Sequence, residues 1–328
     1  MQIQRIDLDQ PGDLLTGLHA TYLAASGDDP GPLVPTRAFA WLVRTGGPGR
    51  RAEAWAASEN GEVVGGYGLA FPQSENTHLG RLFPLVVRPE RRGRGLGSAL
   101  LRHAVDRVRA EGRRLLLAES PATGTGERFA RAQGMTVAVA EARRVLDLRS
   151  ADWTAFERML PQVDGYRLDR WTGPAAPELY TDLAALMAGM NDAPRDGDVE
   201  ALDYDVERVR LREESLALTG DDCYTVIARR ASDGAPAGYT RIRLLADRSS
   251  DWGHQEDTTV LAEHRGRRLG LLLKLANLLW LREREPGIGR IITWNATSNA
   301  HMLAINEALG FRVLDEWNEW RLPVGPRR

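Results

Sequence analysis

The chain has 328 residues, 43% of them hydrophobic and 27% charged, and this length predicts two domains because one hydrophobic core usually stops growing below that size. The formal net charge of -2 argues against a nucleic-acid partner, since such binders usually carry a broad positive excess. A single cysteine, Cys223, excludes an intrachain disulfide, and the composition suggests no metal site.

The first half of the chain alternates apolar strand patterns with helical patterns. Asn60-Gly61 marks a hairpin turn, and an apolar strand leads into a glycine-rich loop at 92–97. The elements predicted here are strand 3–7, helix 12–25, strands 52–57, 63–71 and 82–87, helix 98–110, strand 115–119, helix 125–133 and strand 136–148.

The second half repeats this order after a short linker helix within 150–164. Its predicted elements are strand 166–171, helices 178–190 and 206–218, strands 224–228, 237–244 and 256–261, helix 271–281, strand 290–294, helix 300–309 and strand 312–322. We therefore predict domains at 1–149 and 165–328, with the linker at 150–164, and expect each closing strand to complete the sheet of its own half.

Two landmarks establish an internal duplication. Residues 92–97 (Arg-Gly-Arg-Gly-Leu-Gly) and 265–270 (Arg-Gly-Arg-Arg-Leu-Gly) agree at five of six places, 173 residues apart. Downstream, a helix in each half ends at a glycine, Gly134 or Gly310, and these lie 176 residues apart. Nearly matched register at two landmarks indicates a repeated domain.

The glycine-rich loop carries the first functional signal. A loop between a strand and a helix N-terminus presents several backbone N–H groups to one point, where the helix dipole favours negative charge. Gly95 and Gly97 let the backbone approach a ligand, and Arg92 and Arg94 add charge-assisted donors. We interpret the loop as a pyrophosphate cradle. The alternative, an arginine-rich and glycine-rich surface turn, is disfavoured because the loop occurs twice.

These residues resemble a known family. Residues 85–97 (Leu-Val-Val-Arg-Pro-Glu-Arg-Arg-Gly-Arg-Gly-Leu-Gly) look like motif A of the GNAT acetyltransferases, V-x-P-x-x-[QR]-x-x-G-x-[GA]. Residues 260–270 are similar, but Ala262 replaces the proline and Arg268 replaces the first glycine. Residues 295–311 resemble motif B of the family, where an asparagine near the helix start contacts the coenzyme. The resemblance covers nearly the whole chain and is similar in order to tandem members of the family.

The resemblance implies an α/β (α+β) fold of two tandem GNAT domains. Each domain would have a mixed, mostly antiparallel sheet of about six to seven strands, flanked by helices and splayed around acetyl-CoA. The residues that it assigns to coenzyme binding are Val86, Val87, Arg92, Gly93, Arg94, Gly95, Leu96 and Gly97 in the first half and Val260, Leu261, Arg265, Gly266, Arg267, Arg268, Leu269, Gly270 and Asn299 in the second.

The resemblance also implies the chemistry. The acceptor, usually a primary amine, attacks the thioester directly, so no covalent intermediate is needed. Backbone N–H groups at Val87 and Val260, or at their neighbours, would polarise the thioester carbonyl. In both halves the position where many relatives carry a tyrosine proton donor is occupied by another residue, Ala130 or Asn306. Asn306 is a candidate to hydrogen-bond the thiol sulfur or a water, with Tyr224 and Tyr239 as alternatives.

The second half is favoured for catalysis because it has polar residues before its loop. His254, Glu256 and Asp257 precede Val260, and on an ideal strand His254, Glu256 and Val260 share one face. The corresponding first-half positions, Arg81, Phe83 and Pro84, contain no carboxylate. Two alternatives remain: the polar residues decorate a loop, or Arg268 blocks the second cradle and leaves the first half active.

The function predicted is an acetyl-CoA-dependent N-acetyltransferase with a small-molecule amine acceptor, related to antibiotics or secondary metabolites. The acidic residues from Asp192 to Asp205 would suit a cationic acceptor. The alternatives are a non-catalytic acyl-CoA-binding or regulatory protein and a protein N-acetyltransferase. Without a signal-peptide pattern or eighteen uninterrupted apolar residues, we expect a cytoplasmic monomer or homodimer with no membrane partner. Lys274, the only lysine, reflects codon usage in this interpretation and has no predicted role.

Overall fold

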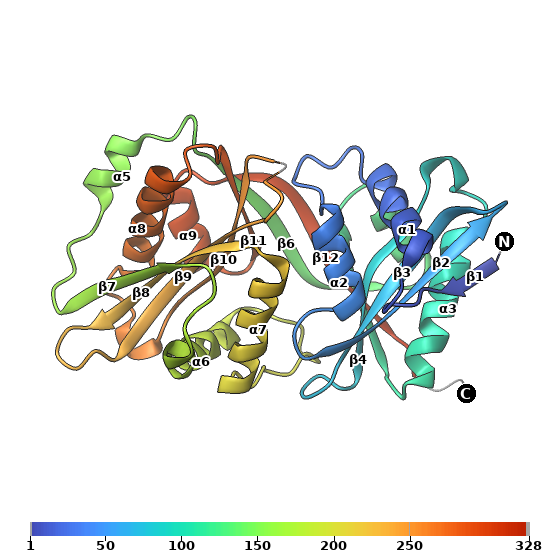
Figure 1. Ribbon diagram of the computed structural model, residues 1–328, viewed down its shortest axis with the longest axis horizontal. Helices are drawn as coiled ribbons and strands as arrows, with labels where there is room; N and C mark the ends of the chain where they lie inside the picture. The colour runs from blue at the N-terminus through green and yellow to red at the C-terminus, as the bar shows by residue number, and fades with distance from the viewer. Residues whose placement is uncertain (1, 249, 326–328) are drawn as a thin grey trace. The chain divides into compact units, whose positions relative to one another are not determined.

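The computed structural model describes residues 2–248 and 250–325 (Figure 1). The chain forms two compact units, and each contains segments from both sequence halves. Unit 1 comprises Met1–Ala140, Arg195–Glu200 and Glu316–Arg328; unit 2 comprises Glu141–Pro194 and Ala201–Asp315.

Unit 1 is built on a sheet with the strand order β1-β2-β3-β4-β5-β12. Only β4 and β5 run parallel among these neighbours; the other pairs are antiparallel. The strands are β1 (Gln2–Arg5), β2 (Arg50–Glu59), β3 (Glu62–Pro72), β4 (Leu79–Val87), β5 (Leu115–Pro121) and β12 (Arg312–Pro323), and the helices are α1 (Gly12–Ala25), α2 (Thr36–Thr45), α3 (Leu96–Ala110) and α4 (Thr125–Ala132).

Unit 2 repeats this arrangement with the order β6-β11-β10-β9-β8-β7, in which β10 and β11 are the parallel pair. The strands are β6 (Thr136–Asp147), β7 (Tyr166–Thr172), β8 (Asp222–Arg230), β9 (Pro236–Leu244), β10 (Trp252–Val260) and β11 (Arg290–Ala296), and the helices are α5 (Trp153–Met159), α6 (Tyr180–Ala188), α7 (Val206–Thr219), α8 (Leu269–Arg284) and α9 (Ala300–Ala308).

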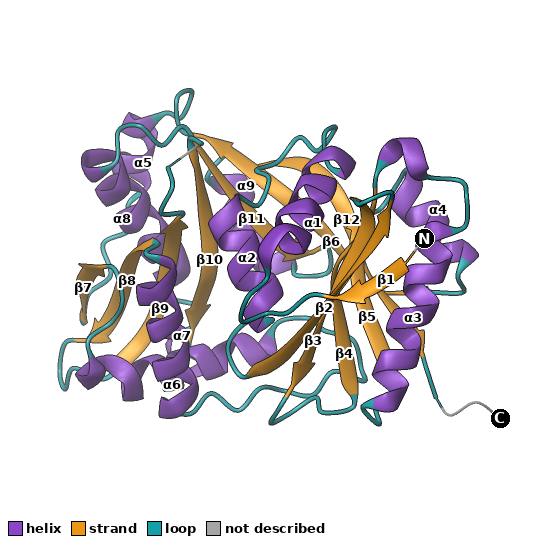
Figure 2. Cartoon of the chain, turned by 45° about the vertical axis from the view of Figure 1, so that its right-hand side comes forward, coloured by secondary structure: helices purple, strands orange, loops and turns teal. Residues whose placement is uncertain are grey.

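Helices cover both faces of each sheet, so each unit has a hydrophobic core on either face, and unit 1 has two smaller buried clusters as well (Figure 2). In unit 1, α3 packs on one face and α1 and α2 on the other. In unit 2, α5 and α8 share one core with the sheet, and α6 and α7 share the other. The predicted class of mixed, mostly antiparallel sheets flanked by helices is confirmed. Of the helices, α2 was not predicted from the sequence.

The closing strands differ from the prediction that each completes its own half. Residues 141–147 of β6 pair with β11 of unit 2, and residues 317–323 of β12 pair with β5 of unit 1. The physical reason lies in the cores: Leu146 packs in the α8 core of unit 2, whereas Trp320 packs against Ala130 and Met135 of unit 1. The predicted domain boundaries remain a proposal for the extent of the two sequence repeats.

Candidate active site

The two glycine-rich loops have the same backbone conformation. Gly93 and Gly266 have φ of 74° and 76°, and the residue preceding each helix is left-handed, with φ of 81° at Gly95 and 62° at Arg268. A left-handed conformation costs a residue with a Cβ roughly 1–2 kcal/mol. The second loop therefore keeps the shape of the first despite the loss of its glycine, and the exposed Arg268 leaves the backbone cradle intact.

Both loops leave helix N–H groups available. The first bonds recorded at the starts of α3 and α8 run from Ala99 N to Gly95 O and from Leu272 N to Arg268 O, each at 3.0 Å. The N–H groups before these positions have no acceptor within their own helix. No side chain at the N-cap position, Gly95 or Arg268, accepts a hydrogen bond from them. Each loop thus fits a pyrophosphate cradle, as the sequence predicts.

The last glycine of each loop serves helix packing. A Cβ at Gly97 would lie 3.2 Å from Phe129 Cε2 on α4, and one at Gly270 would lie 3.2 Å from Ile305 Cδ1 on α9. These contacts show close approach of two helices, whereas the sequence pattern predicts that Gly97 admits a ligand. Leu96 and Leu269 begin the helices and are buried in the cores.

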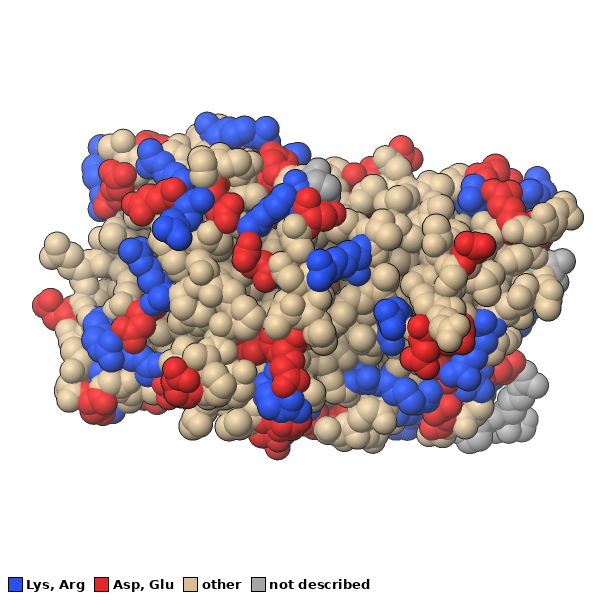
Figure 3. Space-filling model, viewed as in Figure 1, with Lys and Arg blue, Asp and Glu red and all other residues tan. Residues whose placement is uncertain are grey.

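Two of the predicted phosphate-binding arginines brace their loops. Arg92 donates to the carbonyl oxygens of Val87 and Ala25, each at 3.2 Å. Arg265 donates to Val260 O at 3.0 Å and pairs with Asp192. The other three loop arginines, Arg94, Arg267 and Arg268, are exposed. On the face drawn in Figure 3, acidic and basic side chains are interspersed in small groups.

In each unit the parallel strands separate beside the cradle. Pairing of β4 with β5 ends at Leu82 and Ala118, and pairing of β10 with β11 ends at His254 and Ile292. All four strands continue past these points. The strands therefore splay as the resemblance implies, and each leaves an edge of unpaired backbone groups next to a glycine-rich loop.

A backbone N–H group faces this gap in each unit. Arg88 N donates to Val64 O on β3, and Leu261 N donates to Ala237 O on β9, each at 2.9 Å. Successive N–H groups on a strand point to opposite edges, so those of Val87 and Val260 point away from these partners and toward the splayed side. Both positions match the predicted oxyanion donors, and Val86 and Leu261 are their neighbours in the chain.

A β-bulge changes the faces of the predicted catalytic strand. Gln255 pairs with Ile242 and Thr258 with Thr240, so three steps on β10 oppose two on β9. The extra residue moves His254 to the face opposite that of Thr258 and Val260. The prediction that His254, Glu256 and Val260 share one face was wrong, because it assumed an ideal strand.

The bulge residues Glu256 and Asp257 are held in an ion-pair cluster with α7. Arg212 contacts Glu256 at 3.1 Å and Asp257 at 2.6 Å, and Arg243 contacts Glu256 at 2.8 Å. Tyr239 donates to Asp257 at 2.7 Å. Burial raises the pKa of Glu256, but Arg243 and Arg212 outweigh burial and lower it to about 2. Glu256 is therefore a weak proton acceptor, which counts against its predicted role as a base.

His254 has a different environment. Burial, assisted by Arg243, lowers the pKa of His254 to about 4, so its ring is neutral at neutral pH. Its Nε2 atom is buried and, within residues 2–248 and 250–325, has no hydrogen-bond partner. His254 thus has a ring nitrogen without a hydrogen-bond partner among the described residues, whereas Glu256 and Asp257 are held in ion pairs.

Asn306 is fully buried and forms part of a hydrogen-bonded chain. Lys274 Nζ donates to Asn306 Oδ1 at 2.7 Å, and Asn306 Nδ2 donates to Asn295 Oδ1 at 2.7 Å. Both polar ends of Asn306 are thus engaged, although its NH₂ group has a second N–H donor, and its contact with a thiol stays a prediction. Burial lowers the pKa of Lys274 to about 7. Sequence reasoning missed Lys274, although a single lysine among 43 basic residues was a signal.

Unit 1 lacks these polar groups at the equivalent positions. The offset between the loops places Leu101 where unit 2 has Lys274, and Ala130 corresponds to Asn306. Arg81 pairs with Leu117 in unit 1, and the equivalent His254 pairs with Ile292 in unit 2. Counting three residues further along each strand makes Ser120 the equivalent of Asn295. Leu101 and Ala130 are buried apolar side chains. Unit 2 therefore has polar side chains at positions where unit 1 has Leu101 and Ala130.

The other predicted residues have structural partners. Asn299 caps α9 by accepting from Met302 N at 3.3 Å. Part of the acidic segment expected at the acceptor pocket, residues 195–200, belongs instead to unit 1: Asp196 pairs with Arg321 at 3.0 Å, and Asn76 N donates to Glu200 at 2.6 Å. These contacts do not favour its role as an acceptor wall.

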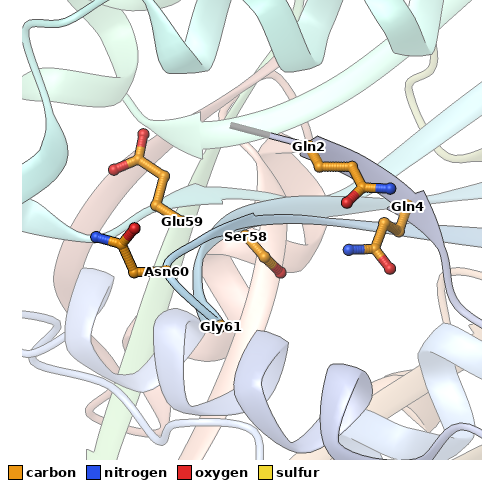
Figure 4. Close-up of a pocket in the computed structure, with 6 residues that line it drawn as sticks. All are labelled: Gln2, Gln4, Ser58, Glu59, Asn60 and Gly61. Atoms are coloured by element: carbon orange, nitrogen blue, oxygen red, sulfur yellow. The ribbon is translucent and has the colours of Figure 1, made fainter.

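The buried cysteine and the cavity of unit 1 involve no residue of the two glycine-rich loops. Cys223 is fully buried, and burial raises the pKa of its thiol to about 12. A cavity of about 550 Å³ lies beside β1 and the β2–β3 turn of unit 1, lined by Gln2, Gln4, Ser58, Glu59, Asn60 and Gly61 (Figure 4). Across the described residues, no helix has the length and apolarity to cross a bilayer, and no cluster of acidic, histidine or cysteine side chains is arranged for a metal ion.

Comparison with known proteins matches both halves of the chain. The family model described as the acetyltransferase (GNAT) family matches residues 20–135 and 188–311. Mycothiol acetyltransferase of Nocardia farcinica (strain IFM 10152) is 27% identical over 308 residues, covering 94% of this chain and 92% of that protein. The similarity therefore extends through both units.

Solved structures agree. A tandem GNAT protein from the clavulanic acid biosynthesis pathway, solved without AcCoA, has a TM-score of 0.84 and 28% identity, covering 100% of this chain and 99% of that one. A GCN5-related N-acetyltransferase from Sphaerobacter thermophilus has a TM-score of 0.66 at 15% identity, covering 100% and 96%, which supports the fold alone.

Proposed function

The chain belongs to the acetyltransferase (GNAT) family and is an acetyltransferase with two GNAT domains in tandem, and from this premise we propose that it transfers the acetyl group of acetyl-CoA to a primary amine of a small molecule. The observation that carries the proposal is the repeated arrangement of a backbone cradle beside two splayed strands. In each unit an N–H group, that of Val87 or Val260, faces the splayed side.

Acetyl-CoA supplies an acyl group activated as a thioester. The N–H groups at the starts of α3 and α8 would hold its pyrophosphate, and the edges of the splayed strands would bind its amide-containing arm. Val260 N–H would stabilise the negative charge that develops on the carbonyl oxygen. These roles remain proposals for the residues assigned from the sequence.

We place the chemistry in unit 2. His254, which is neutral and has a buried Nε2 atom without a hydrogen-bond partner among the described residues, is the proposed proton acceptor for the attacking amine, directly or through water. Glu256 and Asp257 pair with Arg212, and Glu256 also pairs with Arg243, so their charges are balanced within this cluster. Unit 1 has Arg81 at the position of His254 and would serve coenzyme binding or support.

One relative supports the proposed class of acceptor. The neighbour with a TM-score of 0.84 is described as a protein of clavulanic acid biosynthesis, which supports a small-molecule acceptor related to antibiotics or secondary metabolites here. Because acetyl-CoA is the donor, a cytoplasmic location is part of the proposal.

The test is an assay of coenzyme A release with acetyl-CoA and a library of small-molecule amines. Any responding amine is compared with its hydroxyl analogue, which should not respond. Hydrolysis alone across the library would contradict the proposal. Calorimetric binding of acetyl-CoA without turnover would identify a non-catalytic coenzyme-binding protein, and acetylation of peptide amines in place of small molecules would identify a protein N-acetyltransferase.

A further inference from the structure

Lys274 lies in the interior of unit 2, one helical turn beyond the second cradle. It is 1% exposed and follows Gly270 by four residues on α8, so both face the same side of the helix. A Cβ on Gly270 would lie 3.2 Å from Ile305 Cδ1 and 4.0 Å from Val260 Cγ2. Lys274 therefore faces α9 and the strand that carries the candidate oxyanion donor.

A chain of two amides connects Lys274 to β11. Its Nζ atom lies 2.7 Å from Asn306 Oδ1, and Asn306 Nδ2 lies 2.7 Å from Asn295 Oδ1. Asn306 is fully buried, and Lys274 lies 5.3 Å from the centre of the Phe311 ring. In the described chain no carboxylate pairs with Lys274.

The charge of Lys274 fixes the direction of this chain. An ammonium group has three donors and no acceptor, so the atom of Asn306 that it contacts must be oxygen. The amide nitrogen of Asn306 then faces Asn295, whose oxygen must accept. The free end of the chain is consequently the Asn295 NH₂ group, a hydrogen-bond donor.

Asn295 lies on the splayed part of β11. It is three residues past Ile292, where pairing with β10 ends, and it shares a face with Ile291, which packs in the α8 core. The free end of the amide chain is therefore beside the gap and on the same side as Val260, which also packs against that core.

We propose that Lys274 is a positioning residue that, through Asn306, presents the Asn295 NH₂ group as a hydrogen-bond donor to the sulfur of the departing coenzyme thiolate. This inference rests on the proposed function and places the donor on the α8 and α9 side of the sheet. Every proton in the chain stays on its nitrogen, so the step adds a hydrogen bond and transfers nothing.

Two observations support this role. Burial lowers the pKa of Lys274 to about 7, and among the described residues no charged or titratable side chain contributes to this shift. The orientation is therefore enforced below pH 7 and relaxed above it, where the neutral amine has a lone pair. In unit 1, Leu101, Ala130 and Ser120 occupy the equivalent positions and cannot form the chain.

The first test observes Lys274 directly. Because it is the only lysine, protein labelled with lysine carrying ¹³C at the ε position gives one lysine signal. We expect this signal to titrate far below the usual lysine range. Added coenzyme A should raise the midpoint, whereas desulfo-coenzyme A should leave it unchanged. A midpoint in the usual lysine range, or no difference between the two ligands, overturns the inference.

The second test separates positioning from structure. Lys274→Met should lower kcat by about tenfold to a hundredfold with KM for acetyl-CoA nearly unchanged, and should remove the decline of kcat above pH 7. Asn295→Ala should lower kcat similarly. The matched control, Leu101→Met in unit 1, should leave kcat and its pH profile unchanged. If Lys274→Met keeps the wild-type profile, the inference fails.

Failure of the inference differs from failure of the proposed function. Wild-type protein that neither binds coenzyme A in calorimetry nor releases it from acetyl-CoA would overturn both. Wild-type turnover with an amine, together with an unaffected Lys274 signal and an active Lys274→Met variant, would overturn the inference alone.

Discussion

Arg92 and Arg265 hold equivalent positions in the two units: the Nε atom of each donates to the carbonyl oxygen of the last residue of the preceding strand, Val87 at 3.2 Å and Val260 at 3.0 Å. Each arginine therefore fixes the residue whose own N–H faces the splayed side. This relationship allows the two units to be compared with matched variants.

Arg265→Ala and Arg92→Ala test which unit carries the reaction. Removing the brace should let the strand end move, and a misplaced oxyanion donor lowers the rate. We expect Arg265→Ala to lower kcat/KM for acetyl-CoA by about tenfold or more, and Arg92→Ala to have a smaller effect. Steady-state kinetics on both variants measures this. A larger loss in Arg92→Ala would place the chemistry in unit 1.

Arg268→Gly tests the cost of the left-handed residue in the second loop. Glycine adopts φ of 62° without the Cβ clash, so the variant should gain about 1 kcal/mol in free energy of unfolding. Gly95→Ala is the matched change in the other loop and should lose a similar amount. Urea denaturation measures both. A large loss of coenzyme affinity in Arg268→Gly would show instead that the arginine charge binds phosphate.

The pH dependence of stability tests the buried lysine. The pKa of Lys274 falls from 10.5 to about 7 on folding, so between these values the unfolded chain holds a proton that the folded chain has released. The free energy of unfolding should therefore rise with pH through this window, by about 1.4 kcal/mol per pH unit, and the full cost of the buried charge remains below pH 7.

Lys274→Met should lack this rise and be more stable than the wild type at pH 6, because it buries no charge. The measurement is the difference between the two proteins in urea denaturation from pH 6 to pH 9. Parallel stability curves would contradict the lowered pKa of Lys274.

His254→Gln tests the proposed proton acceptor. Since the pKa of His254 without substrate is about 4, kcat/KM should fall as the pH drops below that value in the wild type. The variant should lose about a hundredfold in kcat and lack this acidic limb. The negative charge of Glu256 raises the pKa of His254, so Glu256→Gln should move the limb to lower pH without removing it. A limb that persists in His254→Gln would assign it to another group.

The buried pair Arg241–Glu213 is expected to be structural. The two side chains are 2.8 Å apart and almost fully buried. Arg241→Met should therefore destabilise unit 2 by about 3–5 kcal/mol, because it leaves a buried carboxylate unpaired. Adding Glu213→Leu should recover much of the loss, measured by urea denaturation. The exposed Arg210→Met is a control without measurable effect, and an equal loss there would contradict this account.

The sequence predicted the two repeats and their loops because these features are local. Glycine positions, apolar runs and turn residues depend on neighbours in the chain, and the loop at 92–97 shows the same pattern as that at 265–270. The strand order that completes each sheet depends on distant packing. Leu146 and Trp320 decide it by the cores that they enter, which no local pattern reveals.

At the candidate site, the sequence alone determined the family resemblance, the cradles and the polar segment from His254 to Asp257. Only the tertiary structure decided the rest. The bulge turned His254 to the face opposite Val260, since one added residue reverses the alternation of a strand. Lys274, Asn306 and Asn295 come from three elements and meet only after folding, and their roles follow from burial and hydrogen-bond direction, which distance along the chain does not encode.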